Sequence, residues 1–488
     1  MARMERVSVG SSGLEIARVL TGLWQMADME RDGKQVDLRN CAESMSAYVD
    51  AGITTFDMAD HYGSAEDVAG IFCKEIVSDP AQVQMLTKWC PKPAVMDRAV
   101  VEGAVDISLK RLRTDKIDLL QFHWWDFKDP RYLDAMHELK QLRVEGKIRE
   151  LGVTNVDTSH LRLLIRDGIP IATNQVCFSV LDTRARKPRG MCEFCAEEGV
   201  KILAFGVLGG GFLSERWLGK EEPAAEELQT WSQMKYKRFI DICGWEQFQL
   251  TLRALDQVAR RHSVSIASVA ARWVLQQPGV GGVIIGARLG VSEHISDTIN
   301  LFSFELSTAD MDEIQAVIDA RPRQIPGDCG DEYRRPPFLT AQGDLSHHLD
   351  ALPPVYEQHG GSSGTRVQSG TVWEDIAGFS RAARIGNIIA VSGTTATHGS
   401  RCVGGPDAAA QATFVCDKLE AAVTSLGARL QDVIRTRVFV KRIADWEPVA
   451  RVHGEKFADV RPANSLVQAD LVGDEYLVEI EADAVVTG

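Results

Sequence analysis

Short apolar runs rich in β-forming residues recur along the first 320 residues and alternate with segments of helical periodicity. Between the runs, segments such as AVVEGAVDISLKRL and YLDAMHELKQLRVEG repeat apolar residues at three- and four-residue steps, which is typical of amphipathic helices. Because each parallel strand needs a crossover before its neighbour, this alternation predicts a parallel sheet. Eight runs favour a (β/α)₈ TIM barrel. A doubly wound open sheet is the alternative, but no GxGxxG follows the first run. The runs are 19–26, 52–60, 83–89, 118–125, 147–155, 172–178, 200–206 and 282–287.

The pattern changes across residues 321–364, which contain paired prolines and end in GGSSG. Such a composition predicts a loop and a linker, and its N-terminal part could cover the substrate of the first domain. We therefore divide the chain into a barrel of residues 1–320, this linker, and a smaller α+β domain of residues 365–488. Within the last domain, three strand-like stretches alternate with two helical ones: 381–396, 408–426, 432–443, 446–459 and 476–486.

Composition and charge narrow the classes of function. The 488 residues are 45% hydrophobic and 25% charged, and their formal net charge is -14. An acidic chain repels phosphate backbones and anionic lipid, so we expect neither a nucleic-acid partner nor a membrane partner. The first twelve residues lack the apolar core of a signal peptide, and no apolar run approaches the ~20 residues of a membrane helix. Ten cysteines without a secretory signal indicate reduced thiols and predict a cytoplasmic protein.

One cysteine pair has the spacing of a metal or redox motif. Cys192 and Cys195 stand in MCEFCAEEGV, but no second pair completes four ligands. Residues three apart share one face of a helix, so we interpret the pair as helix packing and predict no metal site.

Candidate chemistry gathers where predicted strands end. Asp57, Tyr62, Lys88 and His123 lie at or just after the ends of three different runs, and barrel enzymes act at the carboxyl ends of their strands. A free phenol is too weak an acid to donate its proton readily at neutral pH, but an adjacent cation stabilises the phenolate. Lys88, held by a buried Asp57, would make Tyr62 a general acid for a carbonyl oxygen that His123 orients. Because no side chain donates hydride, a nicotinamide cofactor is implied.

Residues 14–321 contain, in this order, the motifs FDxADxYG, LTK, DLLQxH, GVTN, NQ, LAFGxLGGGFL and IIGAR. Because of these motifs, this part of the chain resembles the aldo/keto reductase family. The resemblance implies reduction of a small aldehyde or ketone to an alcohol with NADP, or less often NAD, through a tetrad of the four residues above. It places Thr154, Asn155 and Gln175 at the nicotinamide amide and Phe205 against the nicotinamide ring. A nicotinamide-nucleotide-sensing or interaction protein is the alternative.

The phosphates of the cofactor are expected over the ends of the seventh and eighth strands. The turn with Gly206, Leu208 and Gly210 brings backbone N–H groups close to a pyrophosphate. The eighth strand leads into Gly286, Arg288 and His294. Of these, Arg288 is the candidate for binding the 2′-phosphate of NADP. Aromatic walls suit a substrate with an apolar or ring-like body, and the predicted substrate pocket consists of Trp24, Trp89 and Trp124.

The segments FSRAARIGNIIAVSGTTA, DVIRTRVFVKRIADWEPV and RPANSLVQADL resemble the RidA family of imine/enamine deaminase-like, endoribonuclease L-PSP-like proteins. The resemblance implies a chorismate mutase-like trimer, so we expect a homotrimer. Glu479 matches the water-positioning Glu of the family, but Asn464 replaces the Arg that grips the substrate carboxylate. Since a neutral amide cannot supply that bidentate charged contact, we expect the imine deaminase activity to be lost. A bifunctional reductase and imine/enamine hydrolase is the alternative.

Overall fold

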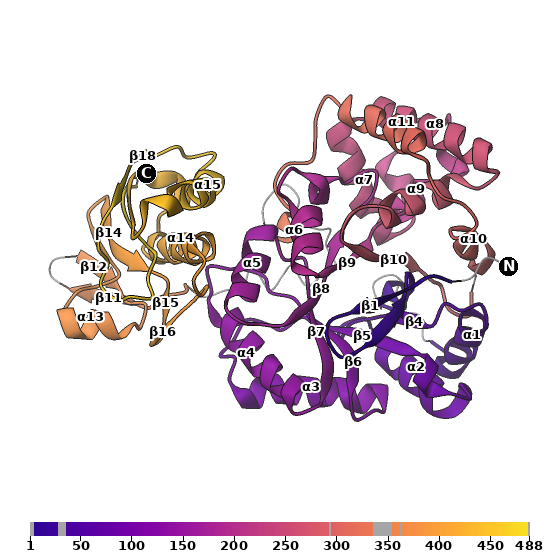
Figure 1. Ribbon diagram of the computed structural model, residues 1–488, viewed down its shortest axis with the longest axis horizontal. Helices are drawn as coiled ribbons and strands as arrows, with labels where there is room; N and C mark the ends of the chain where they lie inside the picture. The colour runs from indigo at the N-terminus through magenta and orange to yellow at the C-terminus, as the bar shows by residue number, and fades with distance from the viewer. Residues whose placement is uncertain (1–3, 28–35, 292–293, 335–353, 362–363, 487–488) are drawn as a thin grey trace. The chain divides into compact units, whose positions relative to one another are not determined.

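Eight parallel strands close into a barrel in the first part of the chain (Figure 1). The computed structural model describes residues 4–27, 36–291, 294–334, 354–361 and 364–486. Each barrel strand falls on one of the eight predicted runs, so the predicted (β/α)₈ barrel is confirmed. The strands are β3 (Val19–Gly22), β4 (Thr55–Asp57), β5 (Gln84–Trp89), β6 (Ile117–Phe122), β7 (Ile148–Thr154), β8 (Ile171–Cys177), β9 (Lys201–Phe205) and β10 (Val280–Gly286).

Helices form the crossovers and surround the barrel (Figure 1). The helix between residues 231 and 243 begins after Thr230, whose hydroxyl accepts the N–H of Gln233 (3.1 Å), and ends at Gly244, whose φ is 93°. In the described ranges, no helix is long and apolar enough to cross a membrane. The helices are α1 (Leu38–Asp50), α2 (Ala65–Ile71), α3 (Arg98–Leu112), α4 (Arg131–Val144), α5 (Thr158–Arg166), α6 (Met191–Glu198), α7 (Trp231–Cys243), α8 (Trp245–His262), α9 (Ile266–Leu275), α10 (Ile295–Asn300) and α11 (Thr308–Asp319).

A hairpin that the sequence did not reveal closes one end of the barrel. Strands β1 (Arg6–Val9) and β2 (Leu14–Ala17) pair antiparallel, and their buried side chains Val9, Leu14 and Ile16 join a core cluster with residues from five barrel strands. Those barrel residues precede the candidate site residues along their strands, as Leu86 precedes Lys88. The apolar core therefore occupies the amino end of the barrel and leaves the carboxyl end to polar side chains.

The second compact unit is built on a seven-stranded sheet with the order β11-β12-β13-β14-β19-β17-β18. Helix α14 lies against β14 and β19 and contacts α15. The predicted smaller α+β domain is confirmed. Its main elements are β11 (Gln358–Gly361), β12 (Gly364–Val367), α13 (Val372–Ala377), β13 (Ala382–Ile385), β14 (Ile388–Thr395), β15 (Thr397–His398), β16 (Arg401–Cys402), α14 (Ala408–Ser425), β17 (Val433–Val440), α15 (Trp446–Lys456), β18 (Ala463–Gln468) and β19 (Val478–Val485).

Part of the predicted linker is structured. Gln358–Gly361 pairs antiparallel with Gly364–Val367, so the glycines of GGSSG stand where a strand turns back on its partner; Ser362 and Ser363 lie outside the described residues. The Gly-rich composition had indicated a flexible link, because glycine has a low intrinsic preference for strands. Pairing with the next strand overrides that preference.

Candidate active site

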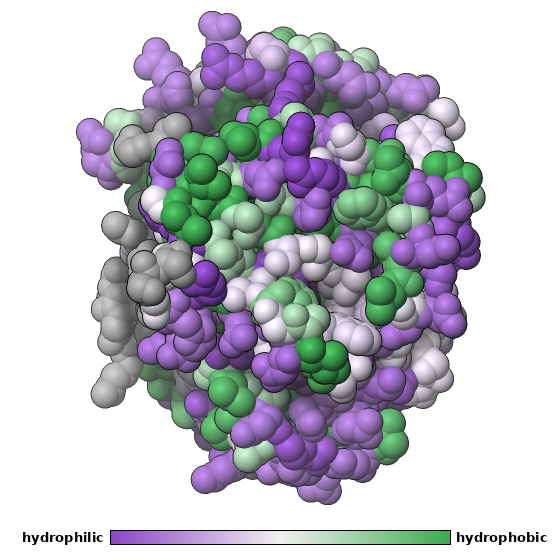
Figure 2. Space-filling model, turned by 90° about the vertical axis from the view of Figure 1, so that its left-hand side faces the viewer, coloured by the Kyte–Doolittle hydropathy of each residue, from purple (hydrophilic) through white to green (hydrophobic). Residues whose placement is uncertain are grey.

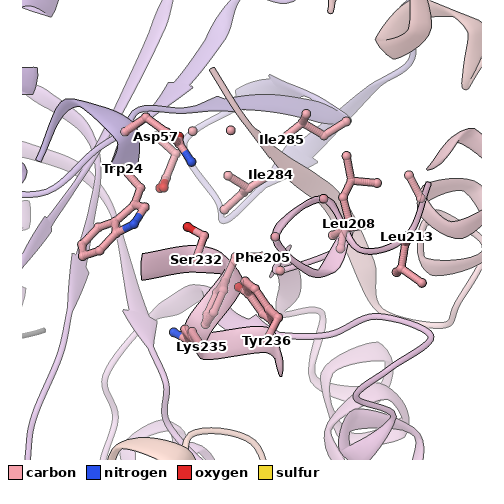
Figure 3. Close-up of a pocket in the computed structure, with 18 of the residues that line it drawn as sticks. Trp24, Asp57, Phe205, Leu208, Leu213, Ser232, Lys235, Tyr236, Ile284 and Ile285 are labelled. Atoms are coloured by element: carbon pink, nitrogen blue, oxygen red, sulfur yellow. The ribbon is translucent and has the colours of Figure 1, made fainter. Parts of the chain in front are cut away.

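A cavity of about 690 Å³ opens at the carboxyl ends of the barrel strands (Figure 3). The structure brings most of the predicted barrel site residues to its wall, although they come from all eight barrel strands and the segments that follow them. The predicted residues that line it are Trp24, Asp57, Tyr62, Lys88, His123, Thr154, Asn155, Gln175, Phe205, Gly206, Leu208, Gly210, Gly286, Arg288 and His294.

A buried ion pair stands at the base of the cavity. The Lys88 ammonium donates to Asp57 Oδ2 (2.7 Å) and to the carbonyl of Met58 (2.8 Å), and both charged side chains are 4% exposed. Lys88 Nζ lies 4.8 Å from the centroid of the Tyr62 ring. A cation held in so dry a place acts strongly on a neighbouring phenol, because little solvent screens its charge.

Two glutamines complete the surroundings of Asp57. Its Oδ1 accepts hydrogen bonds from Gln175 Nε2 (2.7 Å) and Gln121 Nε2 (3.1 Å), so both carboxylate oxygens are satisfied. The amide nitrogen of Gln175 is therefore committed to Asp57. Gln121 was missed by sequence reasoning, although it stands two residues before His123 on the same strand and so shares its face.

The end of β7 supplies polar groups beside the imidazole. His123 Nδ1 donates to the carbonyl of Thr154 (3.3 Å), which orients the ring, and the Thr154 hydroxyl donates to the carbonyl of Gln175 (3.0 Å). Asn155 has a positive φ of 57°, and among the described residues its buried Oδ1 has no hydrogen-bond partner. An acceptor buried in this way fits the N–H of a carboxamide, which is the polar group of a nicotinamide ring.

The glycine-rich turn after β9 is shaped by α7. Gly206 and Gly210 have φ values of 72° and 63°. A Cβ on Gly206 would come within 2.5 Å of the Tyr236 hydroxyl, and one on Gly210 within 2.8 Å of the Ser232 carbonyl. Both positions thus require glycine for backbone conformation and for the close approach of α7, whatever ligand the turn holds.

Of the three tryptophans predicted to form the substrate pocket, one lines the cavity and two do not. Trp24 lines the cavity and meets the Tyr62 ring edge-on at 5.0 Å. Trp89 and Trp124 do not line it: both are buried, with ring centroids 5.5 and 5.8 Å from that of Phe122. Successive side chains of a strand point to opposite faces, so the residues that follow the inward-facing Lys88 and His123 face outward.

Residues 18–319 match the family described as aldo/keto reductase family, which is more than half of the chain. The chain belongs to this family. Membership makes it an oxidoreductase of carbonyl compounds. Residues 372–486 match the family described as endoribonuclease L-PSP, so the reductase carries the second domain that its sequence suggested.

The known relatives match the barrel part of the chain. The reductase is 28% identical over 348 residues to aldo-keto reductase YhdN of Bacillus subtilis (strain 168), which spans 68% of this chain and 98% of that protein. It is 32% identical over 243 residues to Protein tas of Escherichia coli (strain K12), or 46% of this chain and 67% of that protein. A glycerol dehydrogenase from Gluconobacter oxydans shares the fold with a TM-score of 0.55 and 23% identity, over 66% of this chain and 97% of that chain.

One wall of the cavity comes from segments outside the barrel strands. Tyr333 lies in a short 3-10 helix, η9 (Asp331–Tyr333), and its ring centroid is 5.6 Å from that of His123. Lys235 of α7 donates to the Tyr333 hydroxyl (2.6 Å) and lies beside Phe205, with its nitrogen on the side of Trp24 in Figure 3. Sequence reasoning singled out neither residue, because neither stands at a strand end, although Tyr333 lies in the N-terminal part of the 321–364 segment that was expected to cover the substrate.

A buried ion cluster fixes η9 on the barrel. Arg184 donates to both carboxylate oxygens of Asp182 (2.9 and 2.6 Å) and forms a salt bridge with Glu332 (2.7 Å). Burial lowers the pKa of Arg184, but attraction to the two carboxylates outweighs it and holds that pKa well above its usual value. Arg334 donates to the carbonyls of Asn155 and Trp124 on the other side of Tyr333. The phenol is thus held from both sides.

The remaining predicted residues lie away from the cavity. Cys192 and Cys195 are buried in α6, where burial raises the pKa of both thiols, and Cys195 Sγ lies 3.5 Å from Met191 Sδ. In the second domain, Asn464 pairs with Thr436 of β17, while Glu479 pairs with Phe439, three residues further along that strand. An odd separation places the two side chains on opposite faces of the sheet, so one copy does not bring them together.

Proposed function

We propose that the barrel is an NAD(P)H-dependent reductase of an aldehyde or ketone and that Asp57, Tyr62, Lys88 and His123 form its catalytic tetrad. The observation that carries this proposal is the Lys88 ammonium, held by Asp57 and Met58 beside the Tyr62 ring at the carboxyl ends of the strands. Two of the three ammonium N–H groups are used by those oxygens. The third remains for the phenol.

The nicotinamide, when bound, supplies the hydride that reduces the carbonyl carbon. The Tyr62 hydroxyl gives its proton to the carbonyl oxygen, and the Lys88 charge stabilises the phenolate that remains. Asp57 keeps the lysine charged and in place. His123, oriented through Thr154, fixes the carbonyl next to Tyr62, while Trp24 shields the reacting atoms from water.

We propose that the cofactor extends from Asn155 and Phe205 across the Gly206–Gly210 turn to Arg288 and His294. Arg288 is exposed at the cavity wall, and among the described residues no carboxylate forms a salt bridge with it. A guanidinium that no described carboxylate neutralises suits a phosphate, so we assign it to the 2′-phosphate of NADP.

Replacing Arg288 by alanine should weaken NADPH binding about tenfold or more and change NADH binding less than twofold, since only NADPH has a 2′-phosphate. Quenching of tryptophan fluorescence during titration measures both affinities. Arg189→Ala, at a loop outside the cavity, is the control. Equal affinity of the wild-type protein for both nucleotides would contradict the role of Arg288. Absence of binding to either would contradict the reductase proposal itself.

For the second domain we propose a trimerising role without imine deaminase activity, since Asn464 cannot grip a carboxylate as an Arg does. Several aliphatic side chains of its strands are strongly exposed in the single chain: Ile385 (63%), Ile388 (59%), Ile434 (53%) and Val467 (48%). Figure 2 shows hydrophobic side chains among polar ones on the side of the molecule that it presents. Exposed apolar groups of this kind favour association.

Light scattering on the full chain should give three times the mass of one copy. Ile388→Glu should lower the mass to that of the monomer, because a buried carboxylate opposes the contact. Val144→Glu, at an exposed position (73%) at the end of α4, is the matched control and should leave the mass unchanged. A monomeric wild-type protein would refute the trimer.

A further inference from the structure

We propose that the preferred substrate of this reductase is a carbonyl compound that also carries an anionic group, such as a carboxylate, and that Lys235 and Tyr333 bind that group. This inference rests on the proposed function and names its substrate class. Neither residue belongs to the tetrad or to the proposed cofactor contacts, and both line the same cavity.

The position of Lys235 suits a second group of the substrate. Its Nζ is 2.6 Å from the Tyr333 hydroxyl and 4.7 Å from the centroid of the Tyr333 ring, and that ring is in edge contact with His123 (5.6 Å). Tyr333 is therefore in contact with both the ammonium and the imidazole. A small molecule whose carbonyl oxygen lies at Tyr62 and His123 can reach Lys235 through a few bonds or one aromatic ring.

The charge of Lys235 is not neutralised by a carboxylate in the described part of the chain. The next lysine on the same helix, Lys237, forms salt bridges with Glu222 (2.6 Å) and with Asp241, whereas Lys235 forms none with any residue that the structure describes. Instead, three aromatic rings surround its ammonium, with centroids at 4.7 to 5.9 Å: Phe205, Tyr236 and Tyr333. Aromatic faces stabilise a cation without using up its hydrogen bonds. Lys235 thus keeps donors for an anion.

Both residues are fixed before any substrate binds. Lys235 stands on α7, which fits closely against Gly206 and Gly210 through Tyr236 and Ser232. Tyr333 is held by the Arg184–Glu332 salt bridge. Little conformational freedom is lost when an anion binds such a site, so a charge-assisted hydrogen bond there contributes most of its strength to affinity.

The test compares two aldehydes that share one ring and differ in charge, 4-carboxybenzaldehyde and its neutral methyl ester, with the full chain and saturating NADPH. Lys235→Met should lower the ratio of kcat/KM for the acid to kcat/KM for the ester by about tenfold to a hundredfold, the range for hydrogen bonds to charged groups. Lys235→Arg keeps the charge and should retain most of the ratio. Tyr333→Phe removes one hydrogen bond and should lower the ratio less than Lys235→Met does.

The matched control is Lys237→Met, which removes a positive charge from the same helix outside the cavity and should leave the ratio unchanged. Affinity for NADPH, measured by fluorescence quenching, should stay within twofold of wild type in Lys235→Met. An unchanged ratio in that variant, or an equal loss for both aldehydes together with weaker NADPH binding, would overturn this inference and leave the reductase proposal intact. Failure of the wild-type protein to reduce either aldehyde with NADPH or NADH would overturn the proposed function and this inference with it.

Discussion

Replacing Tyr62 by phenylalanine is expected to lower kcat for carbonyl reduction about 10²- to 10⁴-fold, the usual contribution of a positioned general acid. The substitution removes the hydroxyl and keeps the ring, which packs edge-on against Trp24 (5.0 Å) and His61 (4.9 Å). The fold and the cavity should therefore persist. Absorbance of NADPH during a single turnover measures the chemical step, and fluorescence titration should give wild-type cofactor affinity.

Tyr48→Phe is the matched control, because this buried tyrosine of α1 does not line the cavity and its substitution should change kcat less than twofold. Turnover of Tyr62→Phe within tenfold of wild type would show that another group supplies the proton. Tyr333 would then become the candidate, since it is a second phenol beside a lysine in the same cavity.

Replacing Arg184 by leucine should destabilise the barrel by about 3–5 kcal/mol, because removing one partner of a buried ion pair leaves the other charges uncompensated. The side chains of Arg184, Asp182 and Glu332 are at most 1% exposed, so water cannot take over the lost contacts. Arg184 also donates to the carbonyl of Asp328 (2.7 Å), which would lose its partner. Calorimetry should show the barrel transition lowered by several degrees.

The control is Arg260→Leu, which breaks an exposed pair with Asp256 on α8 and should cost less than about 1 kcal/mol. Since Glu332 directly precedes Tyr333, Arg184→Leu should also reduce the preference for anionic aldehydes at temperatures where the barrel remains folded. A loss of stability no larger than that of the control would show that the cluster relaxes without its arginine.

Much of the barrel and of its candidate site could be predicted from the sequence, because both depend on local patterns. Each barrel strand is a short apolar run, and Asp57, Lys88 and His123 reach one cavity because they end three neighbouring strands. The alternation of side chains along a strand also predicts where Trp89 and Trp124 lie. Because Lys88 and His123 point into the barrel, the tryptophan that follows each of them points away from the substrate.

Other features depend on contacts between distant parts of the chain. Tyr333 lies at the cavity because Arg184, almost 150 residues earlier, forms a salt bridge with the preceding residue, Glu332. No local sequence pattern predicts that salt bridge. Strand β18 (ANSLVQ) is largely exposed and carries no clear alternation, so only its pairing with β17 identifies it. The β1–β2 hairpin likewise becomes recognisable through the barrel core that it covers.

The close fit between α7 and the glycine turn has a consequence for how this enzyme can diverge. Gly206 and Gly210 both allow the close approach of α7. The same helix carries Lys235, the residue proposed to determine substrate specificity. A change of specificity by exchange of Lys235, on the side of α7 that lines the cavity, leaves the turn intact. A change that replaces the whole of α7 must preserve Tyr236 and the backbone at Ser232, or the turn loses the surface against which it folds. Evolution of new substrates in this barrel is therefore expected to proceed by point substitution at Lys235 sooner than by loop replacement.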